Sequence, residues 1–185
     1  MGAAHDATTA ADLLPDVATT LVAEATRKAG LIWLAYGPDA GPTGQRPAWH
    51  VWVDGAAYVV TGHGEQDLPG LAKASEVTVV VPSKDTRARI VSWVGRASIV
   101  TPEDETWPAA TTALAASRLN AEGGAAMIDR WSRECNVVRI TPTGRVVETA
   151  EDPSPSSLAA PPRVTTATTL GRQPYMLGGL RRRRG

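Results

Sequence analysis

The feature that most constrains this chain is the dipeptide Asp54-Gly55, which lies between two runs of strand-forming residues, 47–53 and 57–61. Both turn residues tolerate positive φ, which a two-residue turn between antiparallel strands requires. The flanking runs contain several Val, Trp and Tyr residues, which favour strands. The sequence therefore predicts a β-hairpin here, and a fold in which antiparallel strands dominate.

Short apolar or β-branched runs predict four more strands, which brings the total to six. These runs cover residues 31–36, 77–81, 90–100 and 137–141. Gly95 lies inside the longest run, and we expect it to mark a bulge or bend because a small barrel must curve. The segment Pro142-Thr143-Gly144-Arg145 is expected to close the last strand.

Helical spacing is found on both sides of the hairpin. Apolar residues from Leu14 to Ala25 recur at helical spacing and Gly30 follows as a stop, so a helix is predicted over residues 15–29. Shorter helices are predicted around residues 71–75, 106–120 and 125–133. We expect one domain over residues 14–149, with its barrel over residues 30–144.

The two ends of the chain differ from this domain in composition. Residues 1–13 are mostly small and polar, and residues 150–174 are mostly Pro, Ser, Thr and Ala. Such segments bury too little apolar area to offset chain entropy, so disorder is predicted for both. Residues 151–185 hold six arginines and two acidic residues, a net charge of +4, which leaves −4 for residues 1–150 because the total is zero.

Several classes of protein do not fit this composition. The body lacks the clustered Lys and Arg of a nucleic-acid interface, which leaves only Arg181–Arg184 in the tail for such a role. Cys135 is the only cysteine, and the N-terminus lacks a signal-peptide pattern, so a cytoplasmic location is expected. No stretch approaches the roughly 18 apolar residues that span a bilayer. No metal site is predicted, because paired Cys or His ligands at metal-binding spacing are missing.

The order of these elements and four local signatures resemble the flavin- and deazaflavin-binding split β-barrels, the pyridoxamine 5'-phosphate oxidase-like superfamily. The signatures are Arg46-Pro47 through Trp52, Asp54-Gly55, Tyr58 through Gly64, and Gly95-Arg96-Ala97. The resemblance covers residues 30–144. It implies a mainly β (α+β) fold, a six-stranded split β-barrel with peripheral helices, assembled as a homodimer.

The resemblance also implies a cofactor at the subunit interface, either FMN or the deazaflavin F420. The protein would then act as an oxidoreductase that transfers hydride to or from a small molecule, since the ring of the cofactor accepts or donates the hydride. The implied cofactor-binding residues are Trp49, His50, Thr61, Gly62, His63, Gly64, Lys84, Arg87 and Arg89. In the Thr61–Gly64 turn the glycines would let backbone N–H groups approach an anion, and Thr61 would add a hydroxyl donor.

One segment departs from the family pattern. Relatives place a Ser followed by Lys or Arg after this turn, whereas this chain has Glu65-Gln66-Asp67, and an unpaired phosphate would be repelled there. Ile90 lies where the oxidase branch offers a polar flavin contact, so the oxidase reaction on a vitamin B6 substrate is not expected. The alternative is a split barrel without a redox cofactor, serving as a small-molecule binder, haem included, or as an interaction module.

Individual residues leave alternatives open. His50 is read as a partly buried histidine satisfied by a neighbour, or as a ligand or acid/base group; His63 is read as a donor to a phosphate or ring carbonyl, or as an exposed loop residue. The cations at 84, 87 and 89 are read as a phosphate cradle or as a solvated turn.

Further predictions concern three tryptophans, the cysteine and the C-terminal tail. Trp93, Trp107 and Trp131 are predicted to be core or dimer-interface anchors. Cys135 is predicted to be a small buried hydrophobe. Residues 170–185 loosely resemble the peptides that load enzymes into encapsulin shells, which implies a docking role for the tail.

Overall fold

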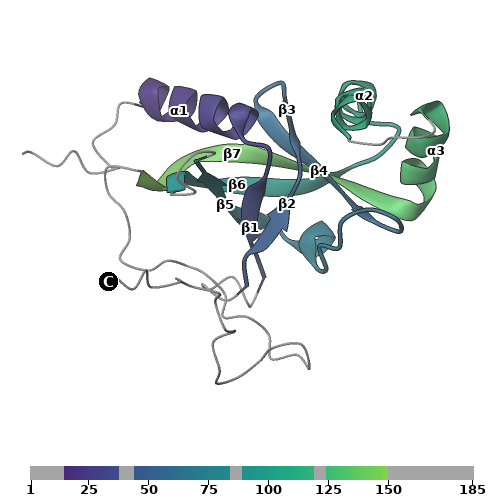
Figure 1. The fold of residues 1–185 in the computed structure, drawn as a ribbon, viewed down its shortest axis with the longest axis horizontal. Coiled ribbons are helices and arrows are strands. Elements are labelled where there is room, and N and C mark those ends of the chain that lie inside the picture. The colour runs from purple at the N-terminus through teal and green to yellow at the C-terminus, as the bar shows by residue number, and fades with distance from the viewer. Residues whose placement is uncertain (1–14, 38–43, 84–88, 119–123, 150–185) are drawn as a thin grey trace, which may run out of the picture.

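A computed structural model describes residues 15–37, 44–83, 89–118 and 124–149, and within these ranges seven strands form one antiparallel sheet. The strands are β1 (Ile32–Ala35), β2 (Arg46–Ala48), β3 (Val51–Val53), β4 (Ala56–Gly62), β5 (Glu76–Pro82), β6 (Arg89–Val100) and β7 (Cys135–Thr149). The helices are α1 (Pro15–Lys28), α2 (Trp107–Ser117) and α3 (Gly124–Glu134), with a short 3₁₀ turn, η2 (Leu71–Lys73). The strands lie in the order β2-β1-β5-β6-β7-β4-β3, and the sheet curls into a half-barrel (Figure 1).

The predicted hairpin is confirmed. Strands β3 and β4 are antiparallel neighbours, and their pairing starts next to the turn, where Val53 lies opposite Ala56. The turn between them is Asp54-Gly55. Both turn residues have positive φ, 46° for Asp54 and 76° for Gly55. The local preference of this dipeptide therefore agrees with the tertiary fold.

The prediction of six strands was wrong by one, because the run 47–53 forms two strands rather than one. Strand β2 pairs with β1 at one edge of the sheet, and β3 pairs with β4 at the other edge. Between them, the backbone N–H of Trp49 donates to Gln66 Oε1 at 2.9 Å, and the Trp49 carbonyl accepts from Gln66 Nε2 at 3.0 Å. A side chain takes the hydrogen bonds that a neighbouring strand would otherwise make, so the chain can cross from one edge to the other.

The last strand is longer than predicted, because Pro142 and Gly144 do not end it. Strand β7 continues to Thr149, and its pairing with β6 shifts register between Gly95 and Trp93. The predicted irregularity at Gly95 is confirmed, and packing explains the glycine. A Cβ atom there would lie 2.4 Å from Ile140 Cγ2.

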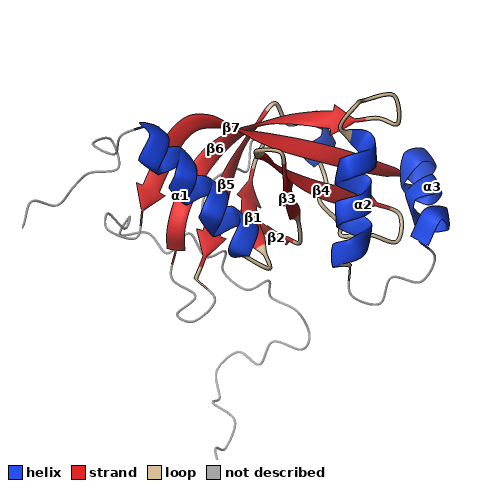
Figure 2. Ribbon diagram, turned by 90° about the horizontal axis from the view of Figure 1, so that it is seen from above, coloured by secondary structure: helices blue, strands red, loops and turns tan. Residues whose placement is uncertain are grey.

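Strand β4 separates two apolar clusters. Its residues 57 and 59 point toward α1 and the inside of the curl, whereas residues 56, 58 and 60 point toward α2 and α3. Trp93 lies in the first cluster, and Trp107 and Trp131 in the second; all three are buried, so they are core residues. Figure 2 shows α1 along one end of the sheet and α2 beside α3 at the other.

Among the described residues, no helix combines the length and the apolar character that a membrane crossing needs. Several predictions fall outside the described ranges. They concern residues 1–13, the linker and tail from residue 150, Arg181–Arg184 and the docking peptide 170–185.

Candidate functional site

The turn after β4 is organised around the buried carboxylate of Glu65, whose side chain is 1% exposed. Arg118 at the end of α2 and Arg130 in α3 both form ion pairs with Glu65 Oε1. The Trp131 indole N–H donates to the same oxygen at 2.8 Å. The hydrogen bond to Glu65 raises the pKa of Arg130. We call Glu65, Arg118, Arg130 and Trp131 the Glu65 cluster; it joins both outer helices to the turn.

The polar groups of Thr61 and Gln66 are also used within the chain. Thr61 Oγ1 donates to the Gln66 carbonyl at 2.9 Å and accepts from the Leu68 N–H at 3.1 Å. The Gln66 side chain bonds the backbone of Trp49 and donates to the Val60 carbonyl at 3.1 Å. Thr61 is 7% exposed, so a ligand would have to displace existing bonds to reach its hydroxyl.

Close contacts with the chain itself account for the two glycines of this turn. A Cβ on Gly62 would lie 2.9 Å from Cys135 Cα, and one on Gly64 would lie 3.1 Å from Arg130 Nη1. The carbonyls of His63 and Gly64 accept hydrogen bonds from Arg130 and Arg118. A phosphate does not fit this turn as built, because the nearby cations are already paired with the buried Glu65 carboxylate.

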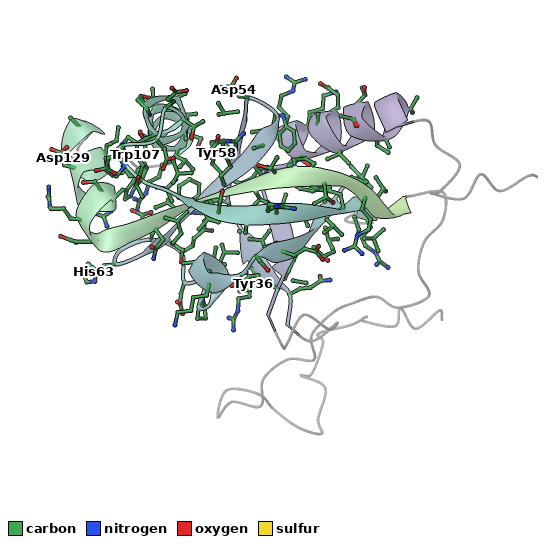
Figure 3. All side chains as sticks on the ribbon, turned by 180° about the vertical axis from the view of Figure 1, so that it is seen from behind. Tyr36, Asp54, Tyr58, His63, Trp107 and Asp129 are labelled. Atoms are coloured by element: carbon green, nitrogen blue, oxygen red, sulfur yellow. The ribbon has the colours of Figure 1, made fainter. Side chains whose placement is uncertain are left out.

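The structure places His63 and Arg89, two of the remaining predicted residues, apart from each other. His63 is exposed at the α3 end of the molecule, with its side chain directed outward (Figure 3). Arg89 lies at the start of β6, eleven residues before Val100. Val100 and Val60 both pair with Val137, so Arg89 and the turn after β4 lie at opposite ends of the sheet, up to roughly 35 Å apart along the strand at about 3.3 Å per residue. Lys84 and Arg87 lie outside the described residues.

Trp49 and His50 line a pocket of about 740 Å³ between the end of α1, the link from β2 to β3 and the end of α2. Trp52, Leu31, Arg27 and Arg118 also line it. We call this the large pocket. Arg118 belongs both to this pocket and to the Glu65 cluster, and Gln66 holds the backbone of Trp49. The turn after β4 therefore positions two walls of the pocket.

Two tryptophans that line the large pocket carry donors that no described residue uses. No acceptor in the described part of the chain takes a hydrogen bond from the indole N–H of Trp49 or Trp52, and neither nitrogen is buried without a partner. By contrast, Trp93 Nε1 donates to Thr26 Oγ1 at 3.1 Å. The pocket walls thus carry two tryptophans with indole donors for a ligand rich in acceptors, together with Arg27 and Arg118, which are ion-paired with Glu24 and Glu65.

His50 is 8% exposed, and its Nε2 lies 2.8 Å from the Thr26 carbonyl, which can only accept. Nε2 therefore carries the proton, and the ring joins the link between β2 and β3 to α1. Burial lowers the pKa of His50, and the bond to Thr26 opposes this shift. The other nitrogen, Nδ1, is buried and has no hydrogen-bond partner. The interpretation of a buried histidine satisfied by a neighbour thus holds at Nε2 alone.

Sequence reasoning missed Arg118, Arg130 and the roles of Gln66 and Arg27. Arg118 and Glu65 are 53 residues apart, and Arg130 and Glu65 are 65 apart, so no local spacing points to these pairs. The unusual acidic residue at position 65 was the one available signal, because a buried carboxylate needs cationic partners.

The sequence predicted a buried Cys135, but in the structure this residue is only half-buried. Its Sγ lies 3.6 Å from the His63 carbonyl and 3.8 Å from Arg130 Nη1. Burial raises the pKa of the thiol, which keeps it protonated near neutral pH. In the described ranges no three His, Cys, Asp or Glu side chains form a group that could hold a metal ion.

Comparison with known structures identifies the class of fold. No protein-family model and no curated protein matches the sequence. A conserved hypothetical protein from Mycobacterium tuberculosis superposes with a TM-score of 0.51 at 19% identity, over 82% of this chain and 93% of that one. The chain has a divergent split β-barrel fold.

Two further structures resemble this split barrel more weakly. The haem storage protein HutZ of Vibrio cholerae gives a TM-score of 0.49 at 17% identity, over 68% of this chain and 90% of that one. A Listeria innocua protein described as a pyridoxamine 5'-phosphate oxidase gives 0.46 at 14% identity, over 70% and 95%. At these identities the likeness concerns the fold, so the function of the barrel has to be argued from its own residues.

Proposed function

We propose that this split barrel binds a planar, anionic ligand of the flavin class, FMN or the deazaflavin F420, in the large pocket. The observation that carries the proposal is the lining of this pocket of about 740 Å³: two tryptophans whose indole N–H groups no described residue uses, and two arginines, Arg27 and Arg118, whose present partners are Glu24 and Glu65. A flavin ring carries carbonyl acceptors and stacks on aromatic side chains, and its phosphate or side-chain acids pair with guanidinium groups.

With such a cofactor the protein would act as an oxidoreductase on a small molecule, as the resemblance implies. When bound, the ring supplies hydride transfer. The chain's own part is to hold and orient the ring: Trp49 and Trp52 are the walls, Arg118 is the partner for an anionic group, and Gln66 fixes Trp49. We include a homodimer in this proposal, on the resemblance alone.

The test is an absorption spectrum of freshly purified protein, followed by titration with FMN, F420 and haem. We expect a flavin or deazaflavin to bind at micromolar concentration, and bound ligand to quench the fluorescence of the pocket tryptophans. A protein that is colourless and binds none of the three at micromolar concentration would exclude the redox function.

The second candidate is a split barrel that binds a small molecule, haem included, without redox chemistry, or that serves as an interaction module. The saturated turn after β4 favours it, since Thr61 and the arginines of the Glu65 cluster are already bonded within the chain. Binding of an acceptor-rich aromatic anion that undergoes no reduction, with no binding of FMN or F420, would support this candidate over the first.

A further inference from the structure

A second, smaller cavity of about 230 Å³ lies on the other side of Trp52. It is formed by the middle of α1 and the irregular part of β7, and it is separate from the large pocket. Its apolar walls are Ala18, Val22, Trp52, Trp93, Pro142 and Val146. Among the lining residues only Trp52 belongs to both cavities.

Trp52 is held between the two cavities by contact with Trp93. Their ring centroids are 6.1 Å apart at an interplanar angle of 89°, an edge-to-face arrangement that is favourable for aromatic pairs. The Trp52 indole is therefore held in place by packing and separates the two cavities. A molecule in one cavity would touch Trp52 without entering the other.

The two cavities differ in chemistry. In the small one, the Trp93 indole N–H already donates to Thr26, and the charged rim residue Arg145 pairs with Glu76 at 2.8 Å. The large pocket, by contrast, is lined by two tryptophans, Trp49 and Trp52, whose indole N–H groups no described residue uses. An apolar group would match the apolar walls, whereas a charged group would lose part of its hydration and would find Arg145 already paired with Glu76.

We propose that the small cavity is a separate subsite for a small, neutral, apolar molecule, such as a monocyclic aromatic or short branched hydrocarbon group. This inference goes beyond the proposed function, because Trp52 stands between the two cavities and keeps the occupant of the small one apart from the ligand of the large pocket. The cavity itself does not depend on which ligand the large pocket holds.

The test uses toluene as the probe and benzoate as its charged counterpart, with binding followed by calorimetry and by chemical-shift changes at Val22 and Val146. Toluene is expected to bind and to shift these residues, and benzoate is not. Ala23→Leu, which adds bulk to the cavity wall, should raise the toluene dissociation constant about tenfold or more. Ala109→Leu, on the exposed face of α2, should leave it unchanged.

Ala18→Leu provides a second filled cavity if Ala23→Leu does not fold. Toluene that shifts neither valine, or that binds the folded filled variants as well as the natural chain, would overturn the subsite. A titration with FMN in the presence of toluene separates the two proposals: competition would overturn the separate subsite. Toluene binding without any flavin binding would leave the subsite standing and exclude the flavin.

Discussion

The turn after β4 and the large pocket share Arg118, but they differ in how their polar groups are used. In the turn, the hydroxyl of Thr61, the amide of Gln66 and the carboxylate of Glu65 all have partners within the chain. In the pocket, the indole N–H groups of Trp49 and Trp52 have none among the described residues. A donor that must give up a bond within the chain to meet a ligand gains little, whereas a donor without such a bond exchanges only water and gains about 0.5–1.5 kcal/mol. The turn therefore serves as support, and the pocket is the place that we propose for a ligand.

The largest expected effect tests the support role of Glu65. Glu65→Ala should lower the free energy of unfolding by about 3 kcal/mol, because it removes the buried carboxylate and leaves two partly buried arginines without their ionic partner. Urea denaturation measures this. The matched control is Glu76→Ala, since Glu76 pairs with Arg145 at the surface and should lose less than about 1 kcal/mol. Equal losses in the two variants would contradict the special role of the cluster.

Thr61→Ala comes next. The loss of two hydrogen bonds should lower the free energy of unfolding by about 1–2 kcal/mol. The affinity for FMN, measured by titration, should stay the same. His63→Ala, at an exposed side chain of the same turn, should change neither stability nor affinity. A loss of about 1–3 kcal/mol of binding free energy in either variant would place the ligand at the turn, as the family resemblance implies.

The pocket tryptophans should show the opposite pattern. Trp49→Phe and Trp52→Phe each remove an indole donor and keep an aromatic ring, so FMN binding should weaken by about 1 kcal/mol with little change in stability. Trp33→Phe is the control, because Trp33 is a half-exposed tryptophan of β1 outside the pocket. Calorimetric titration of the three variants would decide. Equal affinity in all of them would mean that neither indole N–H contacts the ligand.

The smallest expected effect concerns His50. Burial lowers the pKa of His50 in the folded chain, so the unfolded chain takes up a proton first as the pH falls below about 6.5. The free energy of unfolding should thus be constant above that pH and decrease below it. The slope should be a fraction of the ~1.4 kcal/mol per pH unit that corresponds to the uptake of one full proton on unfolding. Urea titrations between about pH 7.5 and 5.5 would show the slope. In His50→Gln this contribution should vanish; an unchanged slope would assign it to other groups.

Local sequence determined much of the fold. The turn dipeptide Asp54-Gly55, the period of the first helix and the apolar runs of β4, β5 and β6 depend on neighbouring residues, so they can be read along the chain. The break at Trp49 and the continuation of β7 past Pro142 could not be read in this way. The first depends on the side chain of Gln66, 17 residues away, and the second on a long pairing with β6.

By itself, the sequence determined that this chain forms a curled antiparallel sheet with Trp93, Trp107 and Trp131 as core or interface anchors, and that Glu65 is unusual for such a turn. Only the tertiary structure decided what that glutamate does. Its partners come from two helices more than 50 residues further along the chain, and burial turns it from a repulsive group into the centre of an ion-paired cluster. The same packing bonds the polar groups of the turn internally and leaves the donors of Trp49 and Trp52 unused, because hydrogen bonding is settled by contacts in space rather than by order in sequence.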